Sequence, residues 1–304
     1  MTTRTGPWAF FLPGPTAVGK SELAVALAER VGGEIVSADA FQIYEGLDIL
    51  SAKPSPEIRS RVPHHLIGEV PVTARFDVAQ WLARARQCIA EITARGQMPI
   101  VCGGTGLYIR ALARGLAELP GADPALRASL EKEPLPSLVD RLLALDPATT
   151  VDVNNPRRVI RALEVCILTG KPFSSFRAEW DQEQAGHGII LTRPREELHA
   201  RIDARTGAMF AAGVVEEVAA AGCLGPTAAQ MLGLREIRAL LAGSITRVDC
   251  ITAIRQATRQ YARRQLIWLR KERGFPWLDL SAATDALGAV EREAARFRVQ
   301  HPLS

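Results

Sequence analysis

One short segment near the start of the chain combines glycines, a lysine and a serine at a spacing that binds phosphate. Residues 14–21 read GPTAVGKS and match the G-x-x-x-x-G-K-[ST] pattern at every fixed position. In such a loop, glycines let backbone N–H groups converge on phosphate oxygens, the lysine adds a full positive charge, and the serine hydroxyl can hold Mg²⁺. The pattern predicts a polyphosphate site, with Ser21 as the metal ligand, formed by Gly14, Pro15, Thr16, Ala17, Val18, Gly19, Lys20 and Ser21.

Two other short segments place polar groups directly after apolar runs. Asp39 is the last residue of EIVSAD, and Thr105 follows MPIVC within the segment GGTG. At the carboxyl ends of parallel strands, both side chains are expected to face the phosphate site. The type of Asp39 fits a general base, a Mg²⁺ partner or a local Asx turn or cap. The GGTG segment fits either a hydroxyl and a close backbone approach to a phosphate or leaving oxygen, or simply a tight turn.

Positive charge is concentrated in two parts of the chain. Between Arg255 and Arg273 the sequence has seven basic residues and a single acidic one, and a smaller cluster comprises Arg157, Arg158 and Arg161. Such clusters either bind the phosphates of a nucleic acid or form solvated helix faces. The formal charge of the whole chain, +4 at pH 7, does not decide between these interpretations.

Strands and helices that alternate along the first part of the chain would position these groups. Short apolar runs at 8–13, 34–39 and 98–104 have the composition of buried strands. Between them, segments 21–33 and 77–95 have apolar residues at helical spacing. The alternation predicts an α/β fold: a P-loop NTPase-like core in which helices flank a parallel sheet.

The middle of the chain has a different pattern and is predicted to be a separate, helical part. From Pro120 onward, helix-like segments are interrupted by prolines and glycines, until GIILT at 188–192 is expected to return the chain to the sheet. After Arg195 almost the whole chain has helical patterning. We therefore expect an α/β core with C-terminal helices at 1–117 and 188–304, and a helical insertion at 118–187.

Composition excludes several other classes of protein. Of the 304 residues, 47% are apolar, which is too many for a disordered chain. No uncharged apolar run is long enough to cross a bilayer, and the first residues lack the pattern of a signal peptide. The five cysteines are spaced too widely for a zinc ribbon or a disulfide framework. These features predict a soluble cytoplasmic protein with no membrane partner.

Further segments, in order along nearly the whole chain, resemble the signatures of one family. They are GPTAVGKSELA, SADAFQIYEGLDILSAKPS, VPHHLI, GGTGLYIRAL, RALEV, RPREELHARID and QYARRQLIWLR. Together they resemble the tRNA dimethylallyltransferases, also called tRNA isopentenyltransferases. The sequence departs from the family pattern at residues 152–155, at Leu234 in place of an aromatic residue, and at Ala40 in place of serine.

The resemblance implies a specific activity. A dimethylallyl group would pass from dimethylallyl diphosphate to N6 of the adenosine 3′-adjacent to the anticodon, position 37, with release of diphosphate. The substrates would be tRNAs that read codons beginning with U, the phosphate loop would hold the diphosphate of the prenyl donor, and the cofactor would be Mg²⁺. The helical insertion would embrace the anticodon stem-loop, and the enzyme would be a monomer.

The resemblance also assigns roles to individual residues. Asp39 is expected to be the general base, Thr105 to lie near the reacting centre, and Lys20 and Arg195 to bind the diphosphate. Contacts with tRNA are expected from Asp39, Ala40, Phe41, Gln42, Thr105, Arg127, Arg157, Arg158, Arg161, Gln230, Gly233, Arg235, Arg263, Arg264, Gln265 and Arg270.

Three other functions remain open. An enzyme that prenylates free adenine nucleotides would not need the basic segments at 157–161 and 255–273. A small-molecule kinase with the same loop would need an adenine pocket and a lid, and the sequence has no convincing Walker-B aspartate after MPIVCGG. A non-catalytic RNA-binding protein would not need an intact phosphate loop followed by Asp39.

Overall fold

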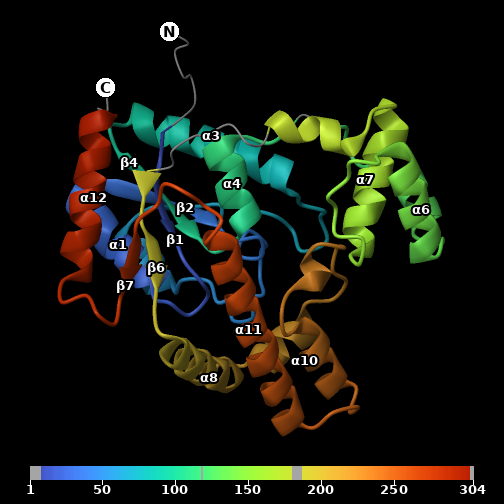
Figure 1. The fold of residues 1–304 in the computed structure, drawn as a ribbon. Helices are drawn as coiled ribbons and strands as arrows, with labels where there is room; N and C mark the ends of the chain where they lie inside the picture. Colours follow the sequence, from blue (N-terminus) through green and yellow to red (C-terminus); the bar gives the residue numbers. More distant parts are fainter. Residues whose placement is uncertain (1–7, 118, 180–186, 302–304) are drawn as a thin grey trace. The chain divides into compact units, whose positions relative to one another are not determined.

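The computed structural model describes residues 8–117, 119–179 and 187–301 (Figure 1). The chain forms two compact units, one made of Met1–Ala113 with Ala185–Ser304 and the other of Arg114–Gln184. The borders that the sequence predicts, at 118 and 187, lie at or beside residues outside the described part. The smaller unit is thus a continuous segment that interrupts the larger one.

A parallel sheet forms the centre of the larger unit. Within the described residues it has five strands in the order β3-β2-β4-β1-β5, with every neighbouring pair parallel. The register aligns Pro13 and Ala38 with Gly103, so the residues that follow these three positions meet at one edge of the sheet. The strands are β1 (Phe10–Pro13), β2 (Gly33–Ala38), β3 (His64–His65), β4 (Met98–Gly103) and β5 (His187–Gly188).

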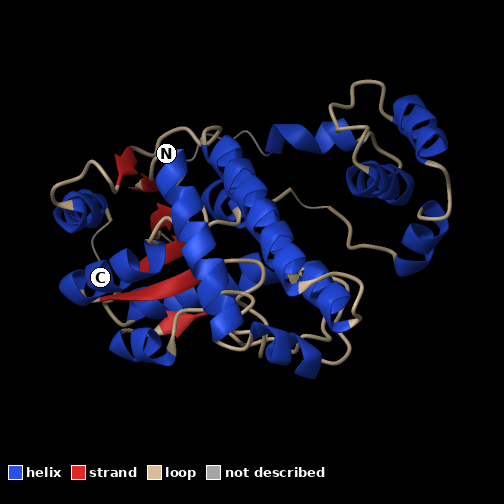
Figure 2. Ribbon diagram, turned by 90° about the horizontal axis from the view of Figure 1, so that it is seen from below, coloured by secondary structure: helices blue, strands red, loops and turns tan. Residues whose placement is uncertain are grey.

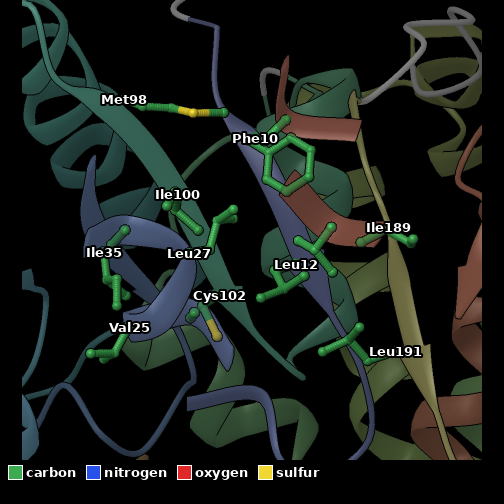
Figure 3. Close-up of a cluster of buried hydrophobic side chains, with 14 of the residues drawn as sticks. Phe10, Leu12, Val25, Leu27, Ile35, Met98, Ile100, Cys102, Ile189 and Leu191 are labelled. Carbon is green, nitrogen blue, oxygen red and sulfur yellow. The ribbon is translucent and has the colours of Figure 1, made fainter. Parts of the chain in front are cut away.

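Helices pack around the sheet (Figure 2) and confirm the predicted α/β fold. Because alternate strand residues point to opposite faces, Phe10, Leu12 and Ile100 lie in the core on the side of α1 and α12 (Figure 3). On the other face, the Trp81 indole of α3 donates a hydrogen bond to the Ser37 carbonyl at 3.0 Å. The helices between and after the strands are α1 (Lys20–Val31), α2 (Pro56–Arg61), α3 (Val78–Ala94), α4 (Gly106–Arg114) and α12 (Ala286–Gln300).

The remainder of the larger unit is mostly helical, as predicted, but it also contains a second sheet. The sequence predicts that 188–192 returns to the main sheet. Gly188 does so in β5, whereas β6 (Ile190–Thr192) pairs in parallel with β7 (Trp277–Asp279). β7 was not predicted, because its three partly exposed residues give no alternating pattern. The helices here are α8 (Arg195–Ala211), α9 (Val214–Ala220), α10 (Leu234–Leu241) and α11 (Arg247–Leu269), with a 3-10 turn η2 (Ala228–Gln230).

The smaller unit is helical where the structure describes it. Leu130, Leu142 and Leu163 belong to its apolar core. Its elements are α5 (Pro124–Leu130), α6 (Leu135–Leu145), α7 (Pro156–Thr169) and the 3-10 segment η1 (Phe173–Glu179). Prolines occupy the first turns of its three α-helices, where a missing N–H costs nothing. Across the described residues of both units, no helix is long and apolar enough to cross a membrane.

Candidate active site at the phosphate-binding loop

The predicted phosphate loop connects β1 to α1 and lies at the edge where the strands end. The Gly14 amide donates to the Gly103 carbonyl at 3.3 Å and so ties the loop to the end of β4. Ala17 and Gly19 have positive φ angles of 65° and 101°, and the helix begins directly after Gly19, at Lys20. The first amides of a helix have no acceptor within it, and the helix dipole adds partial positive charge there. The loop therefore presents an anion-binding helix end.

Arginines from α8 and the residues before it hold the loop from outside. Arg193 Nε donates to the Val18 carbonyl at 2.8 Å, and Arg201 Nε donates to the Ala17 carbonyl at 2.7 Å. Arg205 Nη2 donates to the Thr16 hydroxyl at 2.8 Å. Arg195, which the resemblance placed at the diphosphate, is an exposed residue at the start of α8, and its role stays a prediction.

Sequence reasoning missed these loop-binding arginines, although one signal was present. Arg201 and Arg205 are four residues apart on a helix, so they share a face, and the motif RPREELHARID ends shortly before Arg205. Two arginines on one helix face, in a segment that the resemblance already links to the diphosphate, would have been enough to predict that Arg201 and Arg205 lie at the phosphate loop.

Two largely buried cations lie at the phosphate loop, and the Asp39 charge acts on both. Lys20 Nζ donates to the Pro15 carbonyl at 2.8 Å; burial lowers its pKa, and the carboxylates of Asp39 and Glu22 oppose that shift. Burial also lowers the pKa of Arg205, which Asp39 again opposes. Removing cations from water is costly unless negative charge compensates them. The arrangement favours an anion with more than one charge.

Asp39 and Thr105 lie together, as predicted from their positions after β2 and β4. Asp39 Oδ1 accepts hydrogen bonds from the amides of Phe41 at 2.9 Å and Gln42 at 3.3 Å, so the local Asx turn is present. The Ala40 amide donates to Thr105 Oγ1 at 3.1 Å, and the Thr105 amide donates to the Ala38 carbonyl at 3.1 Å. Because the turn uses only Oδ1, it is compatible with a second role for Oδ2 as an acceptor toward a substrate.

The glycines of GGTG are explained by close approach within the protein. A Cβ atom at Gly103 would lie 2.3 Å from the Ala38 carbonyl oxygen, and one at Gly104 would lie 2.2 Å from Gln265 Nε2. A Cβ atom at Gly106 would lie 2.2 Å from the Trp268 ring. Close packing of β2 and α11 on this segment is thus enough to require these glycines, and the predicted approach of the segment to a phosphate stays a prediction.

Gln265 connects the phosphate loop to the end of β4. It is buried on α11, its Oε1 accepts from the Thr16 amide at 2.8 Å, and its Nε2 donates to the Gly104 carbonyl at 2.8 Å. The resemblance placed Gln265 among the tRNA contacts. In the structure both ends of its amide are used within the protein, so a contact with RNA would compete with these bonds.

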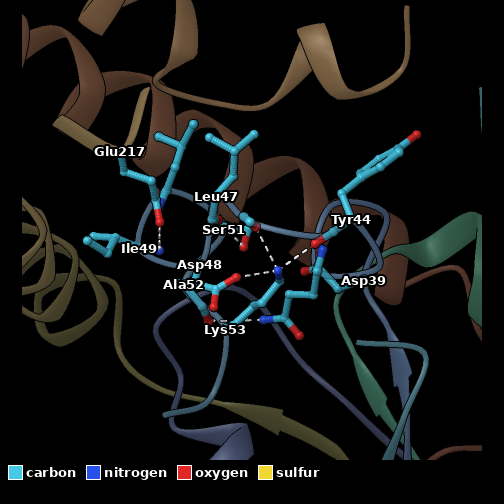
Figure 4. A network of polar contacts seen from close by, with 12 residues as sticks. Asp39, Tyr44, Leu47, Asp48, Ile49, Ser51, Ala52, Lys53 and Glu217 are labelled. Atoms are coloured by element: carbon cyan, nitrogen blue, oxygen red, sulfur yellow. Dashed lines mark hydrogen bonds and ion pairs between the residues drawn. The ribbon is translucent and has the colours of Figure 1, made fainter. Parts of the chain in front are cut away.

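The loop that carries Asp39 is held by its own network (Figure 4). The ammonium of Lys53, a side chain only 2% exposed, donates to the Gly46 carbonyl at 2.7 Å, to the Tyr44 carbonyl and to Asp48 Oδ1. From α9, the Glu217 carboxylate accepts the amides of residues 49 and 50, each at 2.8 Å. The loop that includes the predicted RNA-binding segment 39–42 is therefore held by polar contacts from Lys53 and Glu217.

The remaining predicted RNA contacts on the larger unit are mostly exposed. Arg263 and Arg264 of α11 and Arg270, the residue that caps its C-terminus, are exposed. Arg259 of the same basic segment instead pairs with Asp203 at 2.5 Å. Before α10, Gln230 is exposed and Gly233 has a positive φ of 91°. In the first turn of α10, the side chain of Arg235 is 92% exposed. The basic segment at 255–273 thus divides into internal ion pairs and a free outer face.

In the smaller unit, the predicted RNA contacts also divide into two kinds. Arg157 and Arg158 are exposed at the start of α7. Arg127 and Arg161 instead form ion pairs with Glu164, whose side chain is fully buried. These two pairs compensate the Glu164 charge, so removing either arginine would leave buried negative charge less compensated, whether or not RNA is bound.

The residues present fit a Mg²⁺ ion that is held mainly by the substrate. Within the described residues no group of three or more His, Cys, Asp or Glu side chains could hold a metal ion. Ser21 follows Lys20 in the first turn of α1. Mg²⁺ is commonly bound by one or two protein groups together with phosphate oxygens and water. A serine hydroxyl at a phosphate-binding loop matches that donor set.

Comparison with known proteins identifies the family. The IPP transferase profile matches residues 42–272, and the isopentenyl transferase profile matches residues 8–65. The chain belongs to the IPP transferase family. A tRNA dimethylallyltransferase of Anaeromyxobacter sp. (strain K) is 48% identical over 276 residues, which cover 87% of this chain and 90% of the relative. The tRNA dimethylallyltransferase of Akkermansia muciniphila is 43% identical over 284 residues, covering 93% and 97%.

Solved structures of IPP transferases share the fold of the whole chain. The full-length tRNA isopentenylpyrophosphate transferase of Bacillus halodurans has a TM-score of 0.72 and 32% identity, and the match covers 97% of both chains. A eukaryotic dimethylallyltransferase acting on tRNA has a TM-score of 0.81 and 26% identity, covering 97% of this chain and 80% of that one. The family resemblance and the enzyme class that the sequence predicted are confirmed.

Proposed function

We propose that this IPP transferase moves a dimethylallyl group from dimethylallyl diphosphate to N6 of adenosine 37 of tRNAs that read codons beginning with U, and releases diphosphate. The largely buried pair of cations at the phosphate loop, Lys20 and Arg205, beside the Asp39 carboxylate is the observation that carries the proposal. Such a pair would bind a diphosphate next to a proton acceptor, and the proposed reaction needs both.

The proposed reaction makes one bond and breaks one. The N6 nitrogen attacks the first carbon of the dimethylallyl group, while the bond from that carbon to the bridging oxygen breaks and diphosphate leaves with the electron pair. Asp39 Oδ2 takes the proton that N6 loses. An exocyclic aromatic amine is a weak nucleophile, so a positioned base is useful as the new bond makes N6 acidic.

Positive groups around the loop lower the barrier to departure of the diphosphate. Negative charge develops on the leaving oxygens, where Lys20, Arg205 and the first amides of α1 would face it. Because these groups are already fixed by hydrogen bonds, little reorganisation is needed. Mg²⁺, held at Ser21, would supply further neutralisation of the leaving group when bound.

The acceptor is proposed to be a tRNA because of the free outer face of α11. Arg263, Arg264 and Arg270 are exposed there and would contact RNA phosphates. A stacked adenosine must be turned out to reach a site at the sheet edge, at a cost of a few kcal/mol that phosphate contacts can offset. We place the reaction in the cytoplasm, with the enzyme acting as a monomer.

The experiment incubates the protein with Mg²⁺, dimethylallyl diphosphate and an unmodified tRNA that reads a codon beginning with U. We expect nucleoside mass analysis to find adenosine that carries one dimethylallyl group, and ribonuclease mapping to place it at position 37. A tRNA with another first codon base and free AMP serve as competing acceptors. Lys20→Ala is the matched control. Prenylation of AMP alone, or release of ADP from ATP without prenyl transfer, would contradict the proposal.

A further inference from the structure

The buried glutamine of α11 has its orientation fixed inside the protein. Gln265 is 6% exposed, its Oε1 accepts the Thr16 amide at 2.8 Å, and its Nε2 donates to the Gly104 carbonyl at 2.8 Å. A backbone N–H can only donate and a carbonyl can only accept, so these two partners decide which end of the side-chain amide faces which. Neither partner titrates, so the arrangement is the same at every pH at which the protein is folded.

Close packing around this amide joins the start of the phosphate loop to the end of β4. A Cβ atom at Gly104 would lie 2.2 Å from Gln265 Nε2 and 3.0 Å from the Gly14 carbonyl oxygen. The Gly14 amide also donates to the Gly103 carbonyl at 3.3 Å. The loop is thus tied to this segment at two points, once directly and once through Gln265.

The loop residue that Gln265 holds is also the residue that holds Arg205. Thr16 Oγ1 accepts from Arg205 Nη2 at 2.8 Å. Because the amide and the hydroxyl of Thr16 belong to one residue, fixing the amide limits where the hydroxyl can lie. A continuous chain of hydrogen bonds therefore runs from the Gly104 carbonyl through Gln265 and Thr16 to the guanidinium of Arg205.

We propose that Gln265 is a positioning residue of the diphosphate site, which holds Thr16 and, through it, Arg205 in place for the prenyl donor. The inference rests on the proposed function, since it assumes that the diphosphate of the donor binds at this loop. Gln265 itself does not touch the donor. Groups that are held in place before a ligand arrives lose less freedom when it binds, so the glutamine raises the affinity for the donor.

The first test measures binding of inorganic diphosphate, with Mg²⁺, by titration calorimetry. Gln265→Leu removes both hydrogen bonds, and we expect it to weaken diphosphate binding about three- to ten-fold, the effect of one hydrogen bond. The affinity for tRNA should stay within two-fold. Weaker tRNA binding with unchanged diphosphate binding would overturn the proposal in favour of an RNA contact.

Thr258→Val is the matched control on the same helix. Thr258 is buried and lies two turns before Gln265 on α11, so both residues share a face of the helix. Its hydroxyl donates to the Ile254 carbonyl of its own helix at 2.7 Å. The variant removes a buried hydrogen bond that does not involve the phosphate loop, and it should leave the affinity for diphosphate unchanged.

A conservative variant separates positioning from simple space filling. In Gln265→Glu, the protonated acid has the shape of the glutamine: its carbonyl oxygen can accept the Thr16 amide, and its O–H can donate to the Gly104 carbonyl. The ionised acid has no such donor, and burial should raise the pKa of the new carboxyl. The affinity for diphosphate, relative to the wild type at the same pH, should therefore be close to normal at low pH. It should fall as the pH rises through that raised pKa, whereas Gln265→Leu should stay weak throughout.

The path through Arg205 is tested by a double-mutant cycle. Thr16→Val removes the hydroxyl that Arg205 binds and keeps the amide, so Gln265→Leu should weaken diphosphate binding less in this background than in the wild type. Independent losses in the double variant, or normal diphosphate binding by Gln265→Leu, would overturn the positioning role. If Gln265→Leu does not fold, the pH series of Gln265→Glu decides, and a constant ratio to the wild type would overturn the role.

Failure of the proposed function has a different outcome. A wild-type protein that binds diphosphate but prenylates no tRNA would contradict the proposed function. The binding measurements need no turnover, so they would still decide the role of Gln265.

Discussion

The proposed base can be tested by a substitution that keeps the turn in which Asp39 takes part. In Asp39→Asn the amide oxygen can occupy the position of Oδ1 and accept the amides of Phe41 and Gln42, as the carboxylate does now. The amide nitrogen then occupies the position of Oδ2. An amide nitrogen donates and cannot accept a proton, so the variant retains the local structure and loses only the proposed chemistry.

The expected loss is largest in the chemical step. Removing a positioned base lowers the rate at least about a hundred-fold, or about 2.7 kcal/mol in the activation free energy. The turn is kept, but the free protein loses negative charge that compensates Lys20 and Arg205, so its melting temperature should fall and should recover when the prenyl diphosphate binds. The affinity for the prenyl diphosphate should rise, because Asp39 is a negative charge that now acts on Lys20 and Arg205. Lower kcat together with tighter donor binding would support Asp39 as the general base.

The assay measures single-turnover rates across a Mg²⁺ series, donor affinity and a melting curve. Asp39→Ala is the matched variant, which removes the turn as well and should also melt at a lower temperature. A rate for Asp39→Asn close to that of the wild type would refute the role of the base. Rescue by raised Mg²⁺ with weaker donor binding would assign Asp39 to the metal instead.

Three further predictions concern the parts of the site that surround Asp39. Arg205→Gln should weaken binding of dimethylallyl diphosphate at least ten-fold, since a charge-assisted hydrogen bond is worth roughly 1.5–3 kcal/mol. Titration calorimetry should show that the affinity for tRNA stays within two-fold, and an equal loss of tRNA affinity would contradict a role of Arg205 in donor binding. Gly104→Ala should lower the melting temperature and the transfer rate together, because its Cβ atom would lie 2.2 Å from Gln265 Nε2. An unchanged melting curve would show that the contacts of Gln265 with Thr16 and Gly104 tolerate the added methyl group. The third variant replaces the exposed arginines Arg263, Arg264 and Arg270 together by glutamine. The slope of log affinity for tRNA against log salt concentration should then become shallower by roughly 0.7–0.9 for each RNA phosphate that is no longer neutralised. An unchanged slope would show that these arginines form a solvated helix face.

Local patterns predicted the part of the site that lies next to its strands. The phosphate loop, Asp39 and Thr105 each follow a short apolar run, and the topology of a parallel sheet is enough to bring the ends of such runs together. Arg205 could not be placed this way, because it reaches Thr16 from 189 residues along the chain. Its position depends on how α8 packs, which is a tertiary property.

The roles of the polar residues were harder to predict than their positions. The sequence shows that Gly104 has no side chain, but not that the group close to it is the amide of Gln265 rather than a phosphate. Likewise, the basic segment at 255–273 contains Arg259, whose charge Asp203 compensates, and Arg263, which is exposed. Spacing alone does not separate an internal ion pair from a binding face, because the partner comes from another helix.

The two sides of α11 face the two proposed substrates, the RNA acceptor and the prenyl diphosphate donor. Its outer side presents Arg263 and Arg264, and its inner side carries Gln265, which fastens the Thr16 amide to the Gly104 carbonyl. A helix of 23 residues is a rod about 34 Å long that rotates as one piece. Any turn of this rod on docking of RNA displaces the glutamine by the same angle. If the proposed function holds, docking of the RNA acceptor would in this way change how firmly Gln265 holds the loop that would bind the diphosphate.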